Sequence, residues 1–261
     1  MTDPLVELAV ADQIATVTLA RPDKRNAISD ALLADLDAAL DAVPEETRAI
    51  VLAGRGEHFC AGLDLSAVEV LTPPQVVAHS QSWQRVFNRI QLGGIPVIAA
   101  LHGGVIGGGL ELAAATHIRV AEPDTFFQLP EGRHGIFVGG GGSVRVARII
   151  GTGRMCEMML TNRRLDVEEG YAVGLVHYRV AAGEALVTAQ RLAETVAENA
   201  PISNVAITTV LPRIGNMASD DGMLVESLTA ALTSTDGASR QRIRAFLDGS
   251  KRREPTMDTP S

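Results

Sequence analysis

The chain has 261 residues, 46% of them hydrophobic and 21% charged, which is the balance of an ordinary globular protein with one substantial core. No apolar run approaches the roughly 18 residues that cross a bilayer, the N-terminus lacks the features of a secretory signal, and a net charge of −8 disfavours an extended nucleic-acid surface. The two cysteines, Cys60 and Cys156, form neither a disulfide framework nor a metal pattern, so we expect a protein of the reducing cytoplasm.

Strands and helices alternate through the first half of the chain. Alternating or continuous apolar residues predict strands at 6–10, 14–19, 49–54 and 96–103. Helical spacing predicts a helix over 29–43, with Ser29 as its N-cap, and a second helix over 73–92. The inner side of the second helix is expected to carry Val76, Trp83, Val86, Phe87 and Ile90.

Helices dominate the second half. A helix from about Leu110 and a short strand at 117–121 precede a loop that carries Glu131. Further helices are predicted near 143–150, 152–160, 166–173, 184–199, 219–233 and 236–247. This order predicts an α/β core with a helical C-terminal extension rather than two independent domains, and the tail after Lys251 is expected to be loose.

Three consecutive glycines are followed, after one leucine, by a glutamate in GGVIGGGLELA, residues 103–113. The chain has no G-x-G-x-x-G, P-loop, G-x-S-x-G or H-E-x-x-H pattern, and its six scattered histidines disfavour a metal site. A glycine-rich turn that opens a helix presents unpaired N–H groups, which can hold an anion or an oxygen that becomes one during a reaction. A second donor is expected from EHFCAGLDL, residues 57–65, because that loop also follows a buried strand.

The spaced segments RAIVLAGRGEHFCAGLDL (48–65), PVIAALHGGVIGGGLELAAATHIRVAEPDTFFQLPEGRHGI (96–136) and ARIIGTGRMCEMMLTNRRLDVEEGYAVGLVHYRV (147–180) occur in order. With them the chain resembles the crotonase, or enoyl-CoA hydratase/isomerase, superfamily, over about residues 15–247. The resemblance implies a crotonase (ClpP-like) ββα-spiral core over 1–195 and a helical oligomerisation region over 196–261. It also implies trimers, often paired into hexamers, with helices near Phe246 packing across subunits.

Four residues match the family's catalytic positions. The resemblance implies that the N–H groups of Leu63 and Gly108 hold the thioester oxygen of an acyl-CoA as it becomes negative. Glu111, ionised, is expected to take a proton from the attacking water, and Glu131, protonated, to deliver one to the α-carbon; the reversed or shared assignment stays open. Each glutamate alone is also compatible with a structural role. The prediction therefore depends on finding glutamate at both of the family's positions.

The resemblance also implies where coenzyme A lies. Lys24 and Arg25 occupy the family's nucleotide-side loop and are expected to pair with phosphates. Ala61, Asp64 and Leu65 are expected to line the adenine and pantetheine path.

Five further residues are expected to lie near the acyl pocket or in the core. Val138 stands where the hydratase loop usually has proline. His134 and Phe137 are expected to reach the acyl pocket, where His134 either affects water or Glu131 or is a structural histidine. Cys60 is expected to be a packing residue, and Trp83 a core residue.

Hydration of a trans-2-enoyl-CoA to a 3-hydroxyacyl-CoA, without a metal or redox cofactor, is the function we expect. The stretch 137–143 has no acid, which disfavours dienoyl-CoA isomerases and the chlorobenzoyl-CoA dehalogenase, and Glu111 disfavours hydroxycinnamoyl-CoA hydratase-lyases. An isomerase, hydrolase or decarboxylase with both glutamates stays open, as does a non-catalytic or RNA-binding crotonase-like protein. The sequence leaves the acyl group open among β-oxidation, sterol and aromatic-acid breakdown.

Overall fold

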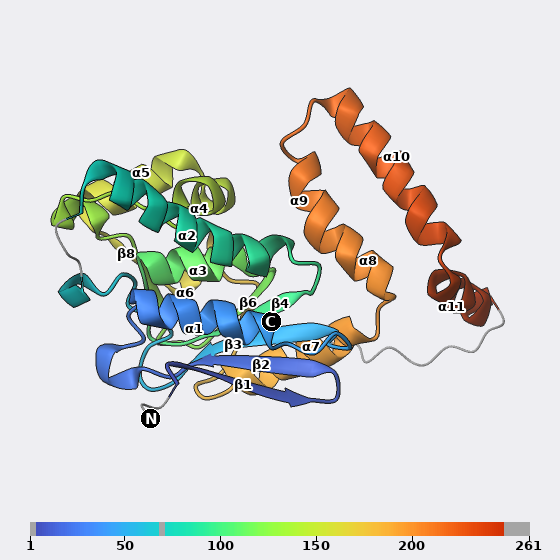
Figure 1. Ribbon diagram of the computed structural model, residues 1–261, viewed down its shortest axis with the longest axis horizontal. Helices are drawn as coiled ribbons and strands as arrows, with labels where there is room; N and C mark the ends of the chain where they lie inside the picture. The colour runs from blue at the N-terminus through green and yellow to red at the C-terminus, as the bar shows by residue number, and fades with distance from the viewer. Residues whose placement is uncertain (1–3, 68–70, 248–261) are drawn as a thin grey trace.

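A computed structural model describes residues 4–67 and 71–247. The predicted α/β fold is confirmed: two sheets and their covering helices form a body, and the C-terminal helices extend from it as an arm (Figure 1). The tail after Lys251, expected to be loose, lies outside the described residues.

The larger sheet is the frame of the body. Its strands are β1 (Val6–Ala11), β2 (Ile14–Leu19), β3 (Ala49–Gly54), β4 (Val97–Leu101), β6 (Ile118–Ala121) and β9 (Tyr178–Arg179), in the order β1-β2-β3-β4-β6-β9. β1 is antiparallel to β2, and every other neighbouring pair is parallel. β3 and β4 read as continuous apolar runs because helices cover both of their faces.

A smaller sheet carries the candidate site. It consists of β5 (Gly104–Ile106), β7 (Phe126–Gln128) and β8 (Arg164–Asp166), with β5 parallel to β7 and β7 antiparallel to β8. A bridge between Cys60 and Val105 joins the 57–65 loop to β5, and β5 leads directly into the glycine-rich turn. This bridge therefore holds the 57–65 loop next to the strand that leads into the glycine-rich turn.

Seven helices and three short 3₁₀ turns complete the described part of the body. They are α1 (Asp30–Asp41), α2 (Pro73–Leu92), α3 (Gly108–Ala115), α4 (Gly142–Ile150), α5 (Thr152–Thr161), α6 (Val167–Ala172), α7 (Ala185–Ala197), η1 (Pro22–Lys24), η2 (Leu65–Ala67) and η3 (Glu131–His134). The core on one face of the larger sheet takes buried residues from α1, α2 and α3, and α7 packs on the other face (Figure 1). Ser29 caps α1 as predicted, because its Oγ accepts from the N–H of Leu32 at 3.3 Å.

One detail of the predicted helices is wrong. Trp83 and the three apolar residues after it on the inner side of α2 are buried, but Val76 is 51% exposed. The first turns of α2 extend past the core, so Val76 lines a pocket instead. The helix expected from about Leu110 is present and begins two residues earlier, at Gly108.

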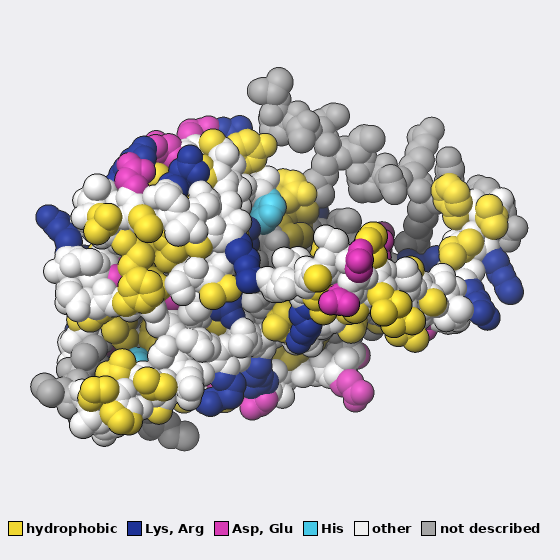
Figure 2. Space-filling view, turned by 90° about the horizontal axis from the view of Figure 1, so that it is seen from above, with side chains coloured by type: hydrophobic (Ala, Val, Ile, Leu, Met, Phe, Trp, Pro, Cys, Tyr) yellow, Lys and Arg dark blue, Asp and Glu magenta, His cyan; other side chains and the backbone are white. Residues whose placement is uncertain are grey.

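The arm follows α7. It consists of α8 (Pro201–Val205), the π-helical turn η4 (Ala206–Val210), α9 (Leu211–Ile214), α10 (Ser219–Thr235) and α11 (Gly237–Leu247). The sequence predicted α10 and α11 but not the helices before them. Figure 2 shows hydrophobic side chains in patches along this arm and Lys and Arg side chains at its outer end. No helix in the described part of the chain is long and apolar enough to span a membrane.

Candidate active site

Two glycine-containing loops meet at a pocket of about 630 Å³. A Cβ atom added to Gly62 would lie 2.6 Å from the carbonyl oxygen of Ile106 and 3.0 Å from the amide nitrogen of Gly108. One added to Gly108 would lie 2.6 Å from Cζ3 of Trp83 and 3.5 Å from the amide nitrogen of Leu63. A side chain at Gly62 would force the loops apart, and one at Gly108 would collide with the indole of Trp83, so both positions need glycine.

The amides of Leu63 and Gly108 are candidate donors at this pocket, which both residues line. Ile28 donates to the carbonyl of Gly62 and accepts from the N–H of Asp64, so the N–H of the intervening Leu63 points away from that bridge. Gly108 is the first residue of α3, where N–H groups lack an intrahelical acceptor. In the part of the chain that the structure describes, neither amide donates to a protein acceptor. Their common action on one oxygen stays a prediction.

Glu111 lies in the first turn of α3 and is only 3% exposed. Its Oε1 accepts from the N–H of Gly142 at 2.7 Å. Burial raises the pKa of Glu111, while the amides of Gly142, Gly140 and Gly139 and the charge of Arg145 act to lower that pKa. The glycine-rich stretch before α4 thus supplies donors that stabilise the ionised carboxylate.

Arg145 holds this glycine-rich stretch in place, a role that the sequence analysis missed. Its buried guanidinium donates to the carbonyl of Gly140 at 2.8 Å, to Oε1 of Gln91 at 2.7 Å and to Oδ1 of Asn88. Burial lowers the pKa of Arg145 and the neighbouring Glu111 raises it. An arginine so close to a glycine run was visible in the sequence, but its partners on α2 were not.

Glu131 has very different surroundings. It begins η3, is 5% exposed, and its Oε2 has no hydrogen-bond partner among the described residues. A Cβ at Gly107 would lie 2.9 Å from its Oε1, so the carboxyl lies directly against the glycine turn. Burial raises the pKa of Glu131 to about 7, the charge of Glu111 adds to the rise, and Glu131's own backbone amide opposes it. Burial thus raises the pKa of both carboxyls, but three amides and an arginine counteract the rise at Glu111, whereas a neighbouring negative charge adds to it at Glu131.

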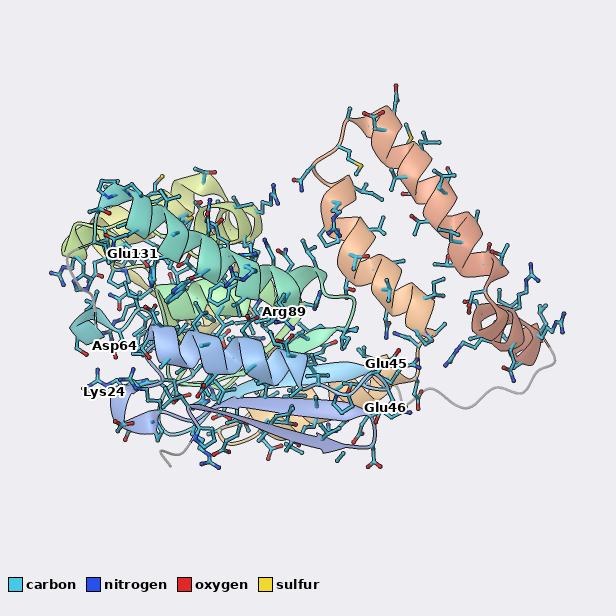
Figure 3. The ribbon with its side chains drawn as sticks, viewed as in Figure 1. Lys24, Glu45, Glu46, Asp64, Arg89 and Glu131 are labelled. Carbon is cyan, nitrogen blue, oxygen red and sulfur yellow. The ribbon has the colours of Figure 1, made fainter. Side chains whose placement is uncertain are left out.

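The residues predicted for coenzyme A separate into two groups. Ala61, Asp64 and Leu65 line the pocket, and their contact with coenzyme A stays a prediction. Lys24 and Arg25 are exposed on and beside η1 and do not line it. Figure 3 shows Glu131, Asp64 and Lys24 towards the same end of the body, away from the C-terminal arm.

Asp64 is engaged within the protein. Its carboxylate accepts from Arg21 at 2.6 Å and from the hydroxyl of Ser66 at 2.5 Å. The hydrogen bonds from Ser66 and Arg21 lower the pKa of Asp64. Asp64 therefore fixes the loop that follows Leu63, and Arg21 is its partner that sequence reasoning missed.

Other predicted residues fall where expected. His134 and Phe137 line the pocket from an exposed segment, and Val138 is buried beside them. Cys60 is fully buried, and burial raises its pKa to about 12, which fits a packing role. Trp83 is buried as predicted, but it also forms a wall of the pocket.

The sequence analysis did not identify Asp30 and His79, which also line the pocket. His79 Nε2 lies 3.0 Å from Oδ1 of Asp30. Among the described residues, no group of three His, Cys, Asp or Glu side chains is arranged to hold a metal ion.

Comparison with known proteins agrees with the resemblance in the motifs. The profile of the enoyl-CoA hydratase/isomerase family matches residues 10–249. A Thermus thermophilus protein assigned as an enoyl-CoA hydratase is 34% identical over 90% of this chain and 94% of its own length. The short-chain-enoyl-CoA hydratase of Clostridium acetobutylicum is 32% identical over 73% of this chain and 74% of its own.

A solved structure gives the same result for the fold. A Rhodopseudomonas palustris protein assigned as an enoyl-CoA hydratase superposes with a TM-score of 0.92 at 47% identity, over 96% of this chain and 97% of that one. This likeness covers the body and most of the arm, and it confirms the predicted fold.

Proposed function

Because the chain belongs to the enoyl-CoA hydratase/isomerase family, within the crotonase superfamily of enzymes, we propose that it is an enoyl-CoA hydratase. It adds water across the 2,3 double bond of a trans-2-enoyl-CoA and yields a 3-hydroxyacyl-CoA. The observation that carries this proposal is the pair of buried glutamates in unlike surroundings at a pocket lined by Leu63 and Gly108, whose backbone amides have no acceptor among the described residues.

The amides of Leu63 and Gly108 stabilise the charge that develops during the reaction. The thioester oxygen accepts hydrogen bonds from both, and it becomes negative as water adds to the β-carbon. The rigid contact between the two loops keeps the donors in place before the reaction. Loss of one such donor typically costs roughly 3 kcal/mol of barrier.

The two glutamates move the protons. Ionised Glu111 removes a proton from water while the oxygen of that water bonds to the β-carbon, and the electrons of the double bond pass to the thioester oxygen. Glu131 then donates its proton to the α-carbon as the enolate collapses. The proton on Glu111 and the charge on Glu131 are reset by exchange with solvent.

Coenzyme A is the rest of the substrate, and the reaction as proposed uses no metal or redox cofactor. Its pantetheine arm passes Ala61 and Leu65, and its phosphates meet Lys24 and Arg25 at the exposed η1 loop. We further propose a cytoplasmic trimer or hexamer in which the apolar faces of the arm are covered by other subunits.

Hydration is tested with a panel of trans-2-enoyl-CoA thioesters of different length and branching. The conjugated thioester loses its ultraviolet absorbance on hydration, and in ¹⁸O-labelled water the product gains one labelled oxygen at the β-carbon. A product with a relocated double bond and no label would identify an isomerase, and free coenzyme A would identify a hydrolase. Either result would replace hydration as the function.

A further inference from the structure

A polar pair interrupts an otherwise apolar part of the pocket. Asp30, the first residue of α1, and His79, in the second turn of α2, lie 3.0 Å apart at Oδ1 and Nε2. The side chains are 83% and 29% exposed, so both can be reached by a ligand in the pocket. The apolar residues that line the pocket include Leu65, Leu71, Val76, Ile136, Phe137 and Val138.

Trp83 connects this pair to the reacting centre. The six-membered edge of its indole lies so close to Gly108 that an added Cβ there would be 2.6 Å from Cζ3. Its Nε1, in the other ring, lies 3.3 Å from Nε2 of His79. His79 is therefore about one indole length from an amide proposed to hold the thioester oxygen, which is within reach of the acyl chain.

Nε2 of His79 cannot donate to Asp30 and accept from Trp83 at the same time. A neutral imidazole has one N–H and one lone pair. If Nε2 carries the hydrogen, it donates to Asp30, and the N–H of Trp83 and the lone pair of Nδ1 are left open. If Nδ1 carries it, Nε2 accepts from Trp83, and the carboxylate of Asp30 and the Nδ1–H are left open. With a neutral ring, each arrangement therefore leaves one donor and one acceptor of these three side chains without a partner among them.

A hydroxyl group satisfies both needs, because it donates one hydrogen bond and accepts others. A carboxylate only accepts, and Asp30 would repel it; an apolar chain would leave both open groups unpaired. Two serine hydroxyls that line the described pocket have other partners: Ser80 donates to the carbonyl of Gly139 at 2.6 Å, and the Oγ of Ser29 accepts from the N–H of Leu32.

We propose that Asp30, His79 and Trp83 form a subsite for a hydroxyl on the acyl group, so that this enzyme acts on hydroxylated enoyl-CoA thioesters. The inference rests on the proposed function for the orientation of the acyl chain. The hydroxyl belongs either to an aliphatic chain or to an aromatic ring, and the two sources share the same chemistry at the subsite.

The test compares substrates that differ only in that hydroxyl. One series is trans-2-octenoyl-CoA with its 6-, 7- and 8-hydroxy derivatives, and one pair is cinnamoyl-CoA with 4-hydroxycinnamoyl-CoA. We expect kcat/KM to be about tenfold higher for the best hydroxylated member of one set than for its plain parent. His79→Phe removes this preference and changes the value for the plain parent much less. His134→Phe, at another pocket histidine, keeps the preference.

A binding experiment separates this inference from the proposed function. Calorimetry with the saturated analogues of both sets needs no turnover, and it should show the same preference in wild type and its loss in His79→Phe. Equal affinity and equal kcat/KM for hydroxylated and plain members of both sets would overturn the subsite, as would a preference that survives His79→Phe. If the binding preference is present but no thioester is hydrated, the subsite stands and the proposed hydration is wrong.

Discussion

Replacing Glu131 by Gln should abolish hydration and yet stabilise the protein at alkaline pH. Below pH 4.5 this carboxyl is protonated in both the folded and unfolded chain, so the amide is a close substitute. Above pH 7 the unfolded chain ionises freely, while the folded one must hold a buried charge whose Oε2 has no partner among the described residues. A pKa that rises from 4.5 to about 7 corresponds to a loss of about 3 kcal/mol of folding free energy, at 1.36 kcal/mol for each pH unit.

The sign of this dependence follows from the raised pKa. The contribution of Glu131 to stability is fully present below pH 4.5 and is lost as pH rises to about 7. Urea unfolding of wild type and Glu131→Gln, at one protein concentration from pH 4 to pH 8.5, measures the difference between their free energies of unfolding. That difference should move by about 3 kcal/mol in favour of Gln across this window. A flat difference would show that Glu131 is not held in an unfavourable ionised state, and its role as the acid would lose its physical basis.

Three further predictions concern the rest of the site. Glu111→Gln should lower kcat by about 10²–10⁴-fold, because the variant cannot take a proton from water. Calorimetry should show nearly unchanged affinity for a saturated acyl-CoA, and near-normal turnover would refute the role of Glu111 as base. Gly108→Ala brings a methyl group to 2.6 Å from the indole of Trp83 on α2, so the loop must shift. Steady-state kinetics should then show a fall in kcat of about 100-fold, and an unchanged kcat would argue that the Gly108 amide does not stabilise the thioester oxygen. Arg145→Met removes a charge that lowers the pKa of Glu111, so the acidic limb of the pH–rate profile should move to higher pH. Arg145→Lys keeps the charge and should move that limb less. Equal profiles for wild type and both variants would leave Arg145 only a packing role.

The longer elements were predictable because their own residues specify them. Ser29 and the apolar spacing after it define α1, and the continuous apolar runs define β3 and β4. The strands β5, β7 and β8 have three residues each, which is too short for any alternation to be visible. They exist because β7 pairs with two distant partners, so only the folded chain determines them.

The same difference separates the predicted from the missed parts of the site. Glu111, Glu131 and the two glycine loops lie in local motifs, and the resemblance could assign them. Arg21, His79 and Arg145 were missed because each acts on a group far along the chain, with separations of 43 residues to Asp64, 49 to Asp30 and 54 to Gln91. No local spacing contains these pairs.

The assignment of acid and base depends on environment, which no motif contains. As residues the two glutamates are identical, so the sequence, which favoured Glu111 as base and Glu131 as acid, left the reversed or shared assignment open. The folded chain gives Glu111 the amide of Gly142 as a hydrogen-bond donor, and the amides of Gly140 and Gly139 and the charge of Arg145 also act to lower its pKa, whereas Oε2 of Glu131 has no partner among the described residues. Burial raises the pKa of both carboxyls, so the proposed assignment rests on the groups that counteract it: they favour the charge at Glu111, while at Glu131 the charge of Glu111 raises the pKa further. The 139–142 backbone, which ends in the first residue of α4, supplies three of the four groups that act to lower the pKa of Glu111, so the proposed proton transfers depend on these glycines as well as on the carboxyl groups.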